Sequence, residues 1–235
     1  MRIQSGHLQH ILYCHLICLL PLVSLGQQYA FELGSTLSRF DYTLANGTKA
    51  DFLIPAAGLS FGIHGIQSLL DTNTISASSG KKSIYFNQHP LIRKIVSALR
   101  YELGFEYLQM NALGNQQKIS FSYQTDFIGL QGALGANISM GRGFSLAGNL
   151  VMQGQKMIQG NQLIANQYYD LKENEQFNGI QLLMGYKAEI LKNLTDKISI
   201  FAAFQESKTY HSAELGKSSL NFCPSQILIG LRLSK

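Results

Sequence analysis

Residues 127–155 read FIGLQGALGANISMGRGFSLAGNLVMQGQ and contain two alternating segments around a short turn. In both segments every second side chain is apolar, and most of the positions between are small or polar. The apolar sets are Leu134, Ala136, Ile138 and Met140 before the turn, and Phe144, Leu146, Leu150 and Met152 after it. Successive side chains of a strand point to opposite faces, so this pattern predicts a β-hairpin with one apolar face. Gly141, Arg142 and Gly143 form the predicted turn, because glycine reaches the positive φ values that short hairpin loops need.

A two-faced hairpin fits two physical settings. A soluble barrel buries its apolar face in the interior, whereas a membrane barrel turns that face toward lipid and keeps its polar face inside. The start of the chain favours the second setting. Residues 1–26 combine Arg2, an apolar run at 11–25 and small residues before Gln27, which predicts a cleaved secretory signal peptide. No later stretch approaches the roughly 18 apolar residues of a membrane helix, so a membrane setting requires a closed barrel.

The composition is typical of strands and argues against nucleic-acid binding. Charged residues make up 14% of the chain, hydrophobic residues 46%, and there are 22 glycines, so helices are disfavoured. The net charge of +5 is dispersed, and its basic pairs, 81–82 and 93–94, are too sparse for a nucleic-acid surface. After removal of 1–26 the single remaining cysteine is Cys223, so no intramolecular disulfide can form.

The alternation predicts eight strands in an all-β, closed, antiparallel, up-and-down barrel. The strands are expected at 29–40, 51–64, 96–109, 118–139, 144–156, 178–190, 198–210 and 225–233. Loops at 41–50, 110–117, 157–177 and 210–224 are longer than the turns at 141–143 and 191–196, which is the layout of outer-membrane barrels. Residues 65–95 form an irregular insertion on the short-turn side. If 72–88 joins the wall as a hairpin, the barrel has ten strands.

The strand at 118–139 carries a change of facing. Phe121 and Tyr123 share one parity, but Leu134 and Ile138 share the other. One extra residue shifts every later side chain to the opposite face, so we expect a β-bulge near 127–129. The segment is also longer than the 9 to 11 or so residues of one crossing, and its excess should project beyond the bilayer.

The mature region resembles a known family in layout. With the hairpin SMGRGFSLAGNLVM at 139–152 and the ending ILIGLRLSK at 227–235, residues 27–235 resemble the small outer-membrane β-barrel domain proteins of Bacteroidota, the PorT-like group. The resemblance implies a location in the bacterial outer membrane and a role near a secretion apparatus. The family's last strand usually ends on an aromatic residue, whereas this chain ends on Leu233, Ser234 and Lys235. Tryptophan is absent, so an aromatic girdle would consist of Tyr29, Phe40, Tyr42, Tyr107, Tyr123, Tyr186 and Tyr210.

The inward positions predict a charge network in the lumen. Its members are Glu32, Arg100, Glu102, Glu106, Asp126, Lys187, Glu189 and Arg232. The interior of an eight-stranded barrel is just wide enough for side chains to fill it, so we expect a charge-paired plug. A narrow conducting or substrate-binding path is the alternative.

Catalytic and metal sites are not predicted. The nearest Ser and His residues are His211 with Ser212 and His64 with Ser60, but adjacent strand residues face opposite sides and no acidic partner orients either pair. His64, His89 and His211 are isolated and lack the close ligand spacing of a zinc site. We therefore expect no enzyme activity and no cofactor.

Three functions fit this sequence. The first is an integral outer-membrane barrel with a structural or interaction role, whose external loops 157–177 and 210–224 contact membrane lipids, lipopolysaccharide or a protein partner. The second is a small pore or an accessory of a transport or secretion apparatus. The third is a soluble periplasmic β-barrel that binds an apolar ligand in its interior.

Overall fold

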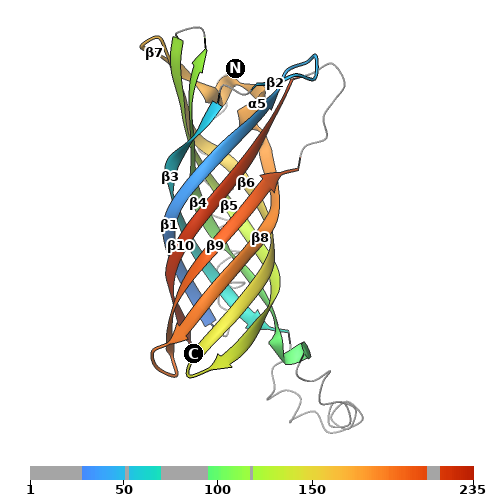
Figure 1. Ribbon diagram of the computed structural model, residues 1–235, viewed down its shortest axis with the longest axis vertical. Coiled ribbons are helices and arrows are strands. Elements are labelled where there is room, and N and C mark those ends of the chain that lie inside the picture. Colours follow the sequence, from blue (N-terminus) through green and yellow to red (C-terminus); the bar gives the residue numbers. More distant parts are fainter. Residues whose placement is uncertain (1–27, 51–52, 70–94, 117–118, 211–217) are drawn as a thin grey trace, which may run out of the picture.

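The computed structural model describes residues 28–50, 53–69, 95–116, 119–210 and 218–235, and the predicted signal peptide lies outside these ranges. Eight long strands form an antiparallel ring (Figure 1). They are β1 (Gln28–Thr43), β3 (Leu53–Ser68), β4 (Leu99–Gln116), β5 (Ile119–Gly141), β6 (Phe144–Ile164), β8 (Ile180–Asn193), β9 (Ile198–Thr209) and β10 (Ser219–Ser234). Each long strand pairs with the next long strand along the chain, which is the predicted up-and-down order.

The first and last strands close the ring. β1 and β10 pair from Gln28 opposite Ser234 to Thr43 opposite Ser219, so the two edges of the sheet satisfy each other. β3 and β4, which flank the predicted insertion, pair directly with one another. The eight-strand prediction is therefore confirmed, and the ring closes without residues 72–88, which lie outside the described residues.

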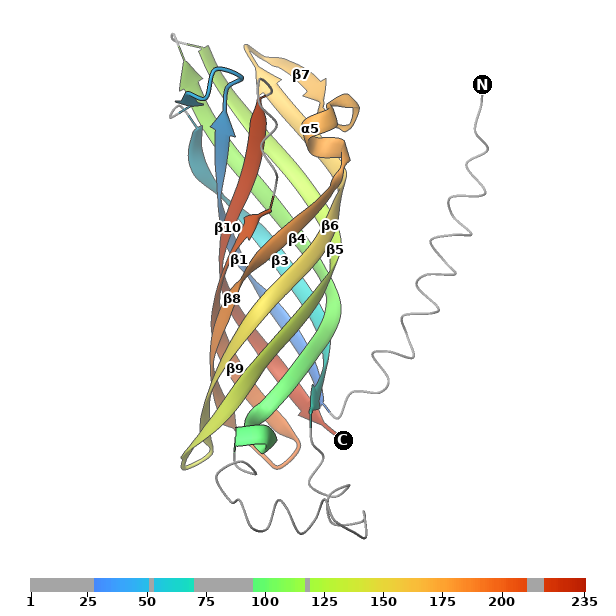
Figure 2. The same cartoon turned by 90° about the vertical axis from the view of Figure 1, so that its right-hand side faces the viewer.

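The two ends of the barrel differ. One end, called the loop end here, carries β2 (Lys49–Ala50), β7 (Gln167–Asp170), the 3₁₀ helix η1 (Leu171–Glu173) and the short helix α5 (Glu175–Asn178) (Figure 2). The other, the turn end, holds the β5–β6 and β8–β9 turns and the C-terminus. Gly141, Arg142 and Gly143 all have positive φ there, as predicted for the hairpin turn. No helix in the described part of the chain has the length and apolar character of a membrane crossing.

Two predicted loops at the loop end are largely strand. β4 continues to Gln116 where a loop at 110–117 was expected, and it pairs there with the start of β5. β6 continues to Ile164 and forms a projecting hairpin with β7, so the expected loop at 157–177 is wrong over much of its length. The outer face of these extensions is mostly polar, with Asn111, Asn115 and Gln159 beside the exposed Leu113, so the apolar alternation of a lipid-facing strand is interrupted there.

The predicted bulge in β5 is also wrong. The pairing of β4 with β5 is unbroken from Leu99 opposite Ala136 to Gln116 opposite Ile119, so the facing of β5 does not change. The irregularity lies in β6 instead, where Ile158 has no partner between the pairs that Met157 and Gln159 make with β5. Aromatic residues of β5 near the loop end therefore point into the barrel.

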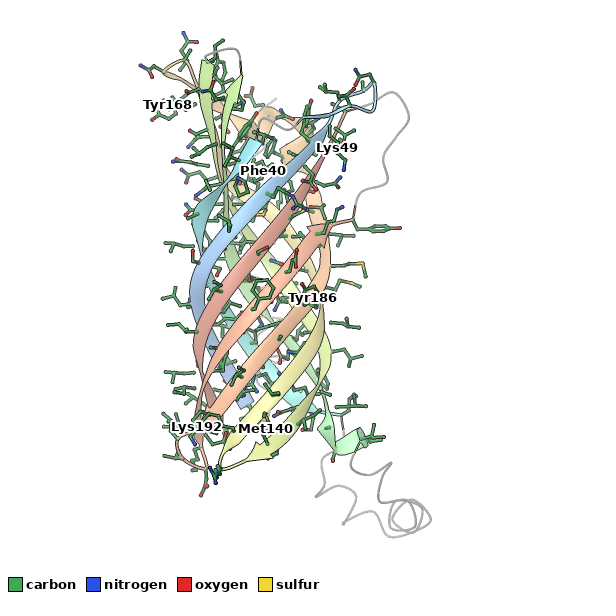
Figure 3. The ribbon with its side chains drawn as sticks, in the orientation of Figure 1. Phe40, Lys49, Met140, Tyr168, Tyr186 and Lys192 are labelled. Carbon is green, nitrogen blue, oxygen red and sulfur yellow. The ribbon has the colours of Figure 1, made fainter. Side chains whose placement is uncertain are left out.

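The apolar face of the strands points outward. Leu134 and Ile229 are 54% and 64% exposed, whereas Glu102 and Lys187 are only 3% and 2% exposed. Side chains project outward all along the wall in Figure 3. A soluble barrel would show the reverse arrangement, so the prediction of a soluble apolar-ligand carrier is wrong.

Candidate functional site: lipid-facing band and filled lumen

A band of outward apolar side chains surrounds the barrel. On β5 it runs from Ile128 to Met140, and neighbouring strands carry similar rows. Outward charged residues limit it toward the loop end, namely Asp126, Lys156 and Glu206. Toward the turn end the outward row of β8 finishes at Lys192, which Figure 3 labels beside the turns. An apolar band between charged borders is the exterior that a bilayer requires of a β-barrel.

β5 continues past this band toward the loop end, as its length predicted, and β6 continues beside it, which was not predicted. Inside this projecting part lies the outer apolar cluster, formed by Phe40, Leu108, Met110, Ala112, Phe127, Met157, Leu171, Phe177, Leu220 and Phe222. The ring of Phe222 makes edge-to-face contacts with Phe40 and Phe127, at centroid distances of 4.9 and 5.6 Å. Phe40 and Tyr123, which were predicted for an outer aromatic girdle, face inward because the cluster packs around them.

Seven of the eight predicted charges lie buried in the lumen, and with His64 we call them the lumen charge network. They are Glu32, Arg100, Glu102, Glu106, Lys187, Glu189 and Arg232. On β1 the order along the strand is Phe40 of the outer apolar cluster, then Glu32, then Ala30 of a smaller apolar group. On β10 the order differs, because Arg232 lies beyond Leu228 of the smaller group. The network therefore lies on the turn-end side of the outer apolar cluster.

One part of the network is centred on Glu32. Its Oε2 atom accepts a hydrogen bond from Lys187 Nζ at 2.6 Å, and its Oε1 atom lies 3.0 Å from His64 Nε2. Lys187 Nζ also lies 3.4 Å from Glu189 Oε1, which links this part to the next. The contact of Glu32 on β1 with Lys187 on β8 crosses the lumen, whereas Glu32 and His64 lie on the neighbouring strands β1 and β3.

The other part is centred on Glu189. Its Oε2 atom accepts from Arg100 Nη2 at 2.5 Å and from Arg232 Nη2 at 2.9 Å. Arg100 Nη2 also lies 3.0 Å from Glu102 Oε1. Buried ions are tolerated when they are paired and hydrogen-bonded in this way, because each pairing offsets part of the cost of removing the charge from water.

Asp126 does not lie in the lumen, where it was predicted. It lies on the outer face of the barrel, where its Oδ1 atom accepts a hydrogen bond from Gln109 Nε2 at 3.1 Å. Because β5 has no bulge, Asp126 shares the facing of Leu130 and Leu134 rather than that of the buried Gln131. Its charge instead contributes to the border of the lipid-facing band.

The predicted lumen network contained charged residues alone and left out much of what fills the lumen. His64 and six buried glutamines line it, and the glutamines are Gln131, Gln153, Gln155, Gln181, Gln205 and Gln226. Gln205 Nε2 donates to Gln131 Oε1 at 3.0 Å, and Gln226 Nε2 donates to Glu106 Oε1 at 2.8 Å. The alternation along each strand could have identified these inward residues. His64, for example, shares the inward face of Ser60 and Gly62.

Inward glycines make room for these side chains. A Cβ atom on Gly62 would lie 2.5 Å from His64 Nε2, and one on Gly104 would lie 2.5 Å from His64 Nδ1. On the outer face, by contrast, a Cβ atom on Gly132 or Gly148 would meet nothing within 4 Å. The high glycine content thus serves the packing of the interior.

The arrangement suits packing better than catalysis. Four carboxylates face three permanent cations and one histidine, which leaves the lumen close to neutral. The imidazole of His64 contacts Glu32 rather than Ser60, and the pair His211 with Ser212 lies outside the described residues. In the described ranges no group of three His, Cys, Asp or Glu residues could hold a metal ion.

A closed barrel with an apolar exterior and a charged interior defines the class. Only helices and closed barrels satisfy every backbone group in lipid, and barrels of this pattern span the bacterial outer membrane. The protein is an integral outer-membrane β-barrel protein. No protein-family model and no curated protein matches the chain.

Solved structures with a similar fold are small outer-membrane barrels. They include a major outer membrane protein from Thermus thermophilus, with 11% identity and a TM-score of 0.45 over 87% of this chain and 98% of that chain. Neisserial surface protein A has 9% identity and a TM-score of 0.42 over 88% and 99% of the two chains. OprG from Pseudomonas aeruginosa has 10% identity and a TM-score of 0.40 over 89% and 96%.

Proposed function

We propose that this protein is a closed outer-membrane barrel with a structural or interaction role, which does not conduct solutes. The observation that carries the proposal is the filling of the lumen by contacts between strands that are not neighbours in the wall. Glu189 of β8 meets Arg100 of β4, and Gln205 of β9 meets Gln131 of β5. An eight-stranded barrel has little interior space beyond what such side chains occupy.

The loop end is the proposed contact surface. Strands without lipid-facing side chains project there, and the β6–β7 hairpin presents Tyr168 and Tyr169, both exposed. Exposed tyrosines are enriched at protein interfaces, because one end of the ring is apolar and the other forms hydrogen bonds. We propose lipopolysaccharide and a partner protein as the contacts of this end, through 157–177 and through 210–224, of which 211–217 lie outside the described residues.

An accessory role in secretion is the second candidate. The resemblance of 139–152 and 227–235 to the PorT-like group favours it, and such a role needs a protein contact at one end of the barrel rather than an open lumen. Co-purification of a secretion component with the wild-type barrel, lost in a Tyr168→Ser/Tyr169→Ser variant, would support this candidate over a purely structural one.

Conductance tests the closed lumen. The full-length protein, purified in detergent and shown to be folded by its shift on an unheated gel, is added to planar bilayers. We expect no single-channel current from the wild type. As a positive control, the Arg100→Ala/Arg232→Ala variant removes two large side chains from the network and should produce transient openings. Stable wild-type currents would overturn the proposal and favour a pore.

A further inference from the structure

The loop end of the lumen contains a recess of about 190 Å³. Its floor includes Phe40 and Leu220, which belong to the outer apolar cluster. The other lining residues are Tyr42, Leu53, Tyr123, Gln162, Asn174, Gln176 and Phe177. Because the cluster closes it below, the recess opens toward the loop end and not into the charged part of the lumen.

The lining combines aromatic rings with amides and contains no charged side chain. The rings of Tyr123 and Phe177 are nearly parallel, with centroids 6.1 Å apart and an interplanar angle of 14°. Gln162 Nε2 donates a hydrogen bond to Tyr123 Oη at 2.6 Å. Aromatic faces carry partial negative charge and attract C–H groups, and amides both donate and accept hydrogen bonds.

Several hydrogen bonds hold the recess in shape. Asn174 Oδ1 accepts from the backbone N–H of Gln176 at 3.0 Å and caps α5. Gln176 Nε2 donates to Ser218 Oγ at 2.8 Å, which fastens the start of α5 to the segment leading into β10. These bonds hold α5, whose Phe177 is buried in the outer apolar cluster. A site formed before ligand arrives loses less conformational entropy on binding.

We propose that this recess binds a single uncharged pyranose ring. One face of a pyranose presents C–H groups that suit the aromatic side chains, and its hydroxyl rim suits the three amides. The volume lies below the range of about 300–1,000 Å³ for drug-sized ligands, which limits the occupant to one ring. The uncharged lining argues against anionic sugars, because a buried anion needs a cationic partner. Free monosaccharides and the saccharide part of lipopolysaccharide both supply such a ring.

Saturation-transfer NMR on the detergent-purified full-length barrel tests this proposal. The probes are methyl α-D-glucopyranoside and N-acetylglucosamine, each at about 10 mM, since one ring in a preformed site should bind with a Kd on the order of 1 mM. Saturation transfer to the ring protons of either probe is the expected result. Absence of transfer to both probes would overturn the proposal, while leaving the closed-barrel proposal to be judged by conductance.

Variants locate the binding. Gln162→Ala and Tyr123→Leu should each weaken binding about tenfold, as expected for loss of a main contact. Lys197→Ala is the control, because Lys197 is exposed in the β8–β9 turn at the opposite end of the barrel from the recess, and this variant should bind as the wild type does. The shift on an unheated gel checks that each variant is folded. Unchanged binding by a folded Gln162→Ala variant would place the sugar elsewhere and overturn the assignment.

Competition distinguishes the two sources of the ring. Lipid-free oligosaccharide from lipopolysaccharide is titrated against the bound monosaccharide. Loss of the monosaccharide signal supports the recess as a contact with lipopolysaccharide. A monosaccharide signal that persists supports a site for free sugar. The competition experiment is the one test here that depends on the loop end facing the cell exterior.

Discussion

Lys187 Nζ lies 2.6 Å from Glu32 Oε2, although the two residues are 155 positions apart in the chain. The first is on β8 and the second on β1, and both side chains are buried. Two strands, β9 and β10, separate them in the wall, so the pair forms only when the ring is nearly closed. The Lys187–Glu32 contact therefore forms only in the closed barrel, and it stabilises that closed state.

Removing the lysine should be costly. Lys187→Met leaves Glu32 buried with only His64 beside it, and we expect a loss of about 3–5 kcal/mol in the free energy of unfolding. The double variant Lys187→Met/Glu32→Gln removes the uncompensated charge and should recover part of that loss. Urea unfolding in detergent micelles measures all four members of this cycle. A single variant as stable as the wild type would show that the ion pair contributes nothing.

Glu106 and Glu189 should respond differently to neutralisation. Glu189 contacts two arginines and a lysine, so Glu189→Gln leaves cations unpaired and should cost about 3–5 kcal/mol. Glu106 accepts a hydrogen bond from Gln226, and in the described structure its Oε2 atom has no hydrogen-bond partner. Glu106→Gln should therefore change stability by less than about 1 kcal/mol. Equal losses in the two variants, measured by urea unfolding, would contradict this view of the network.

The strands could be predicted from the sequence because lipid imposes a strong local rule. Alternation around Leu134 and Leu150 identified the hairpin, and the same parity placed Arg100, Glu102 and Lys187 inside. The rule fails where the strands leave the membrane. Phe121 and Tyr123 are then inward aromatic residues, and their parity was mistaken for evidence of a bulge.

Contacts between strands could not be predicted in the same way. The unpaired Ile158 of β6 depends on how β6 pairs with β5, which alternation in either strand does not report. The recess at the loop end is lined by Tyr42, Tyr123 and Phe177, which come from three separate segments of the chain. His64 was considered with Ser60 as a catalytic pair without an acidic partner, because its partner Glu32 lies on another strand, 32 positions away in the chain.

Two glycines offer a matched test of interior packing. A Cβ atom on Gly104 would lie 2.2 Å from the carbonyl oxygen of Ile63, which cannot move without disturbing the sheet. Gly104→Ala should therefore cost about 1–3 kcal/mol. Gly132 faces outward with nothing within 4 Å, so Gly132→Ala should stay within about 0.5 kcal/mol of the wild type. Thermal midpoints from the gel shift measure both, and a larger loss in the Gly132 variant would refute the assigned facing of β5.

The limits of the lipid-facing band can be tested with arginine. Leu134 lies midway along the apolar row of β5, between Ile128 and Met140, so Leu134→Arg should cost about 2–4 kcal/mol in lipid vesicles. Leu113 is also exposed, but it lies on β4 beyond the charged border, where its partner across the sheet is Ser122. Leu113→Arg should cost less than about 1 kcal/mol, because its side chain stays in water. Folding into vesicles from urea compares the two variants. If the two variants lose the same stability, the bilayer does not end at the border that Asp126 and Lys156 mark.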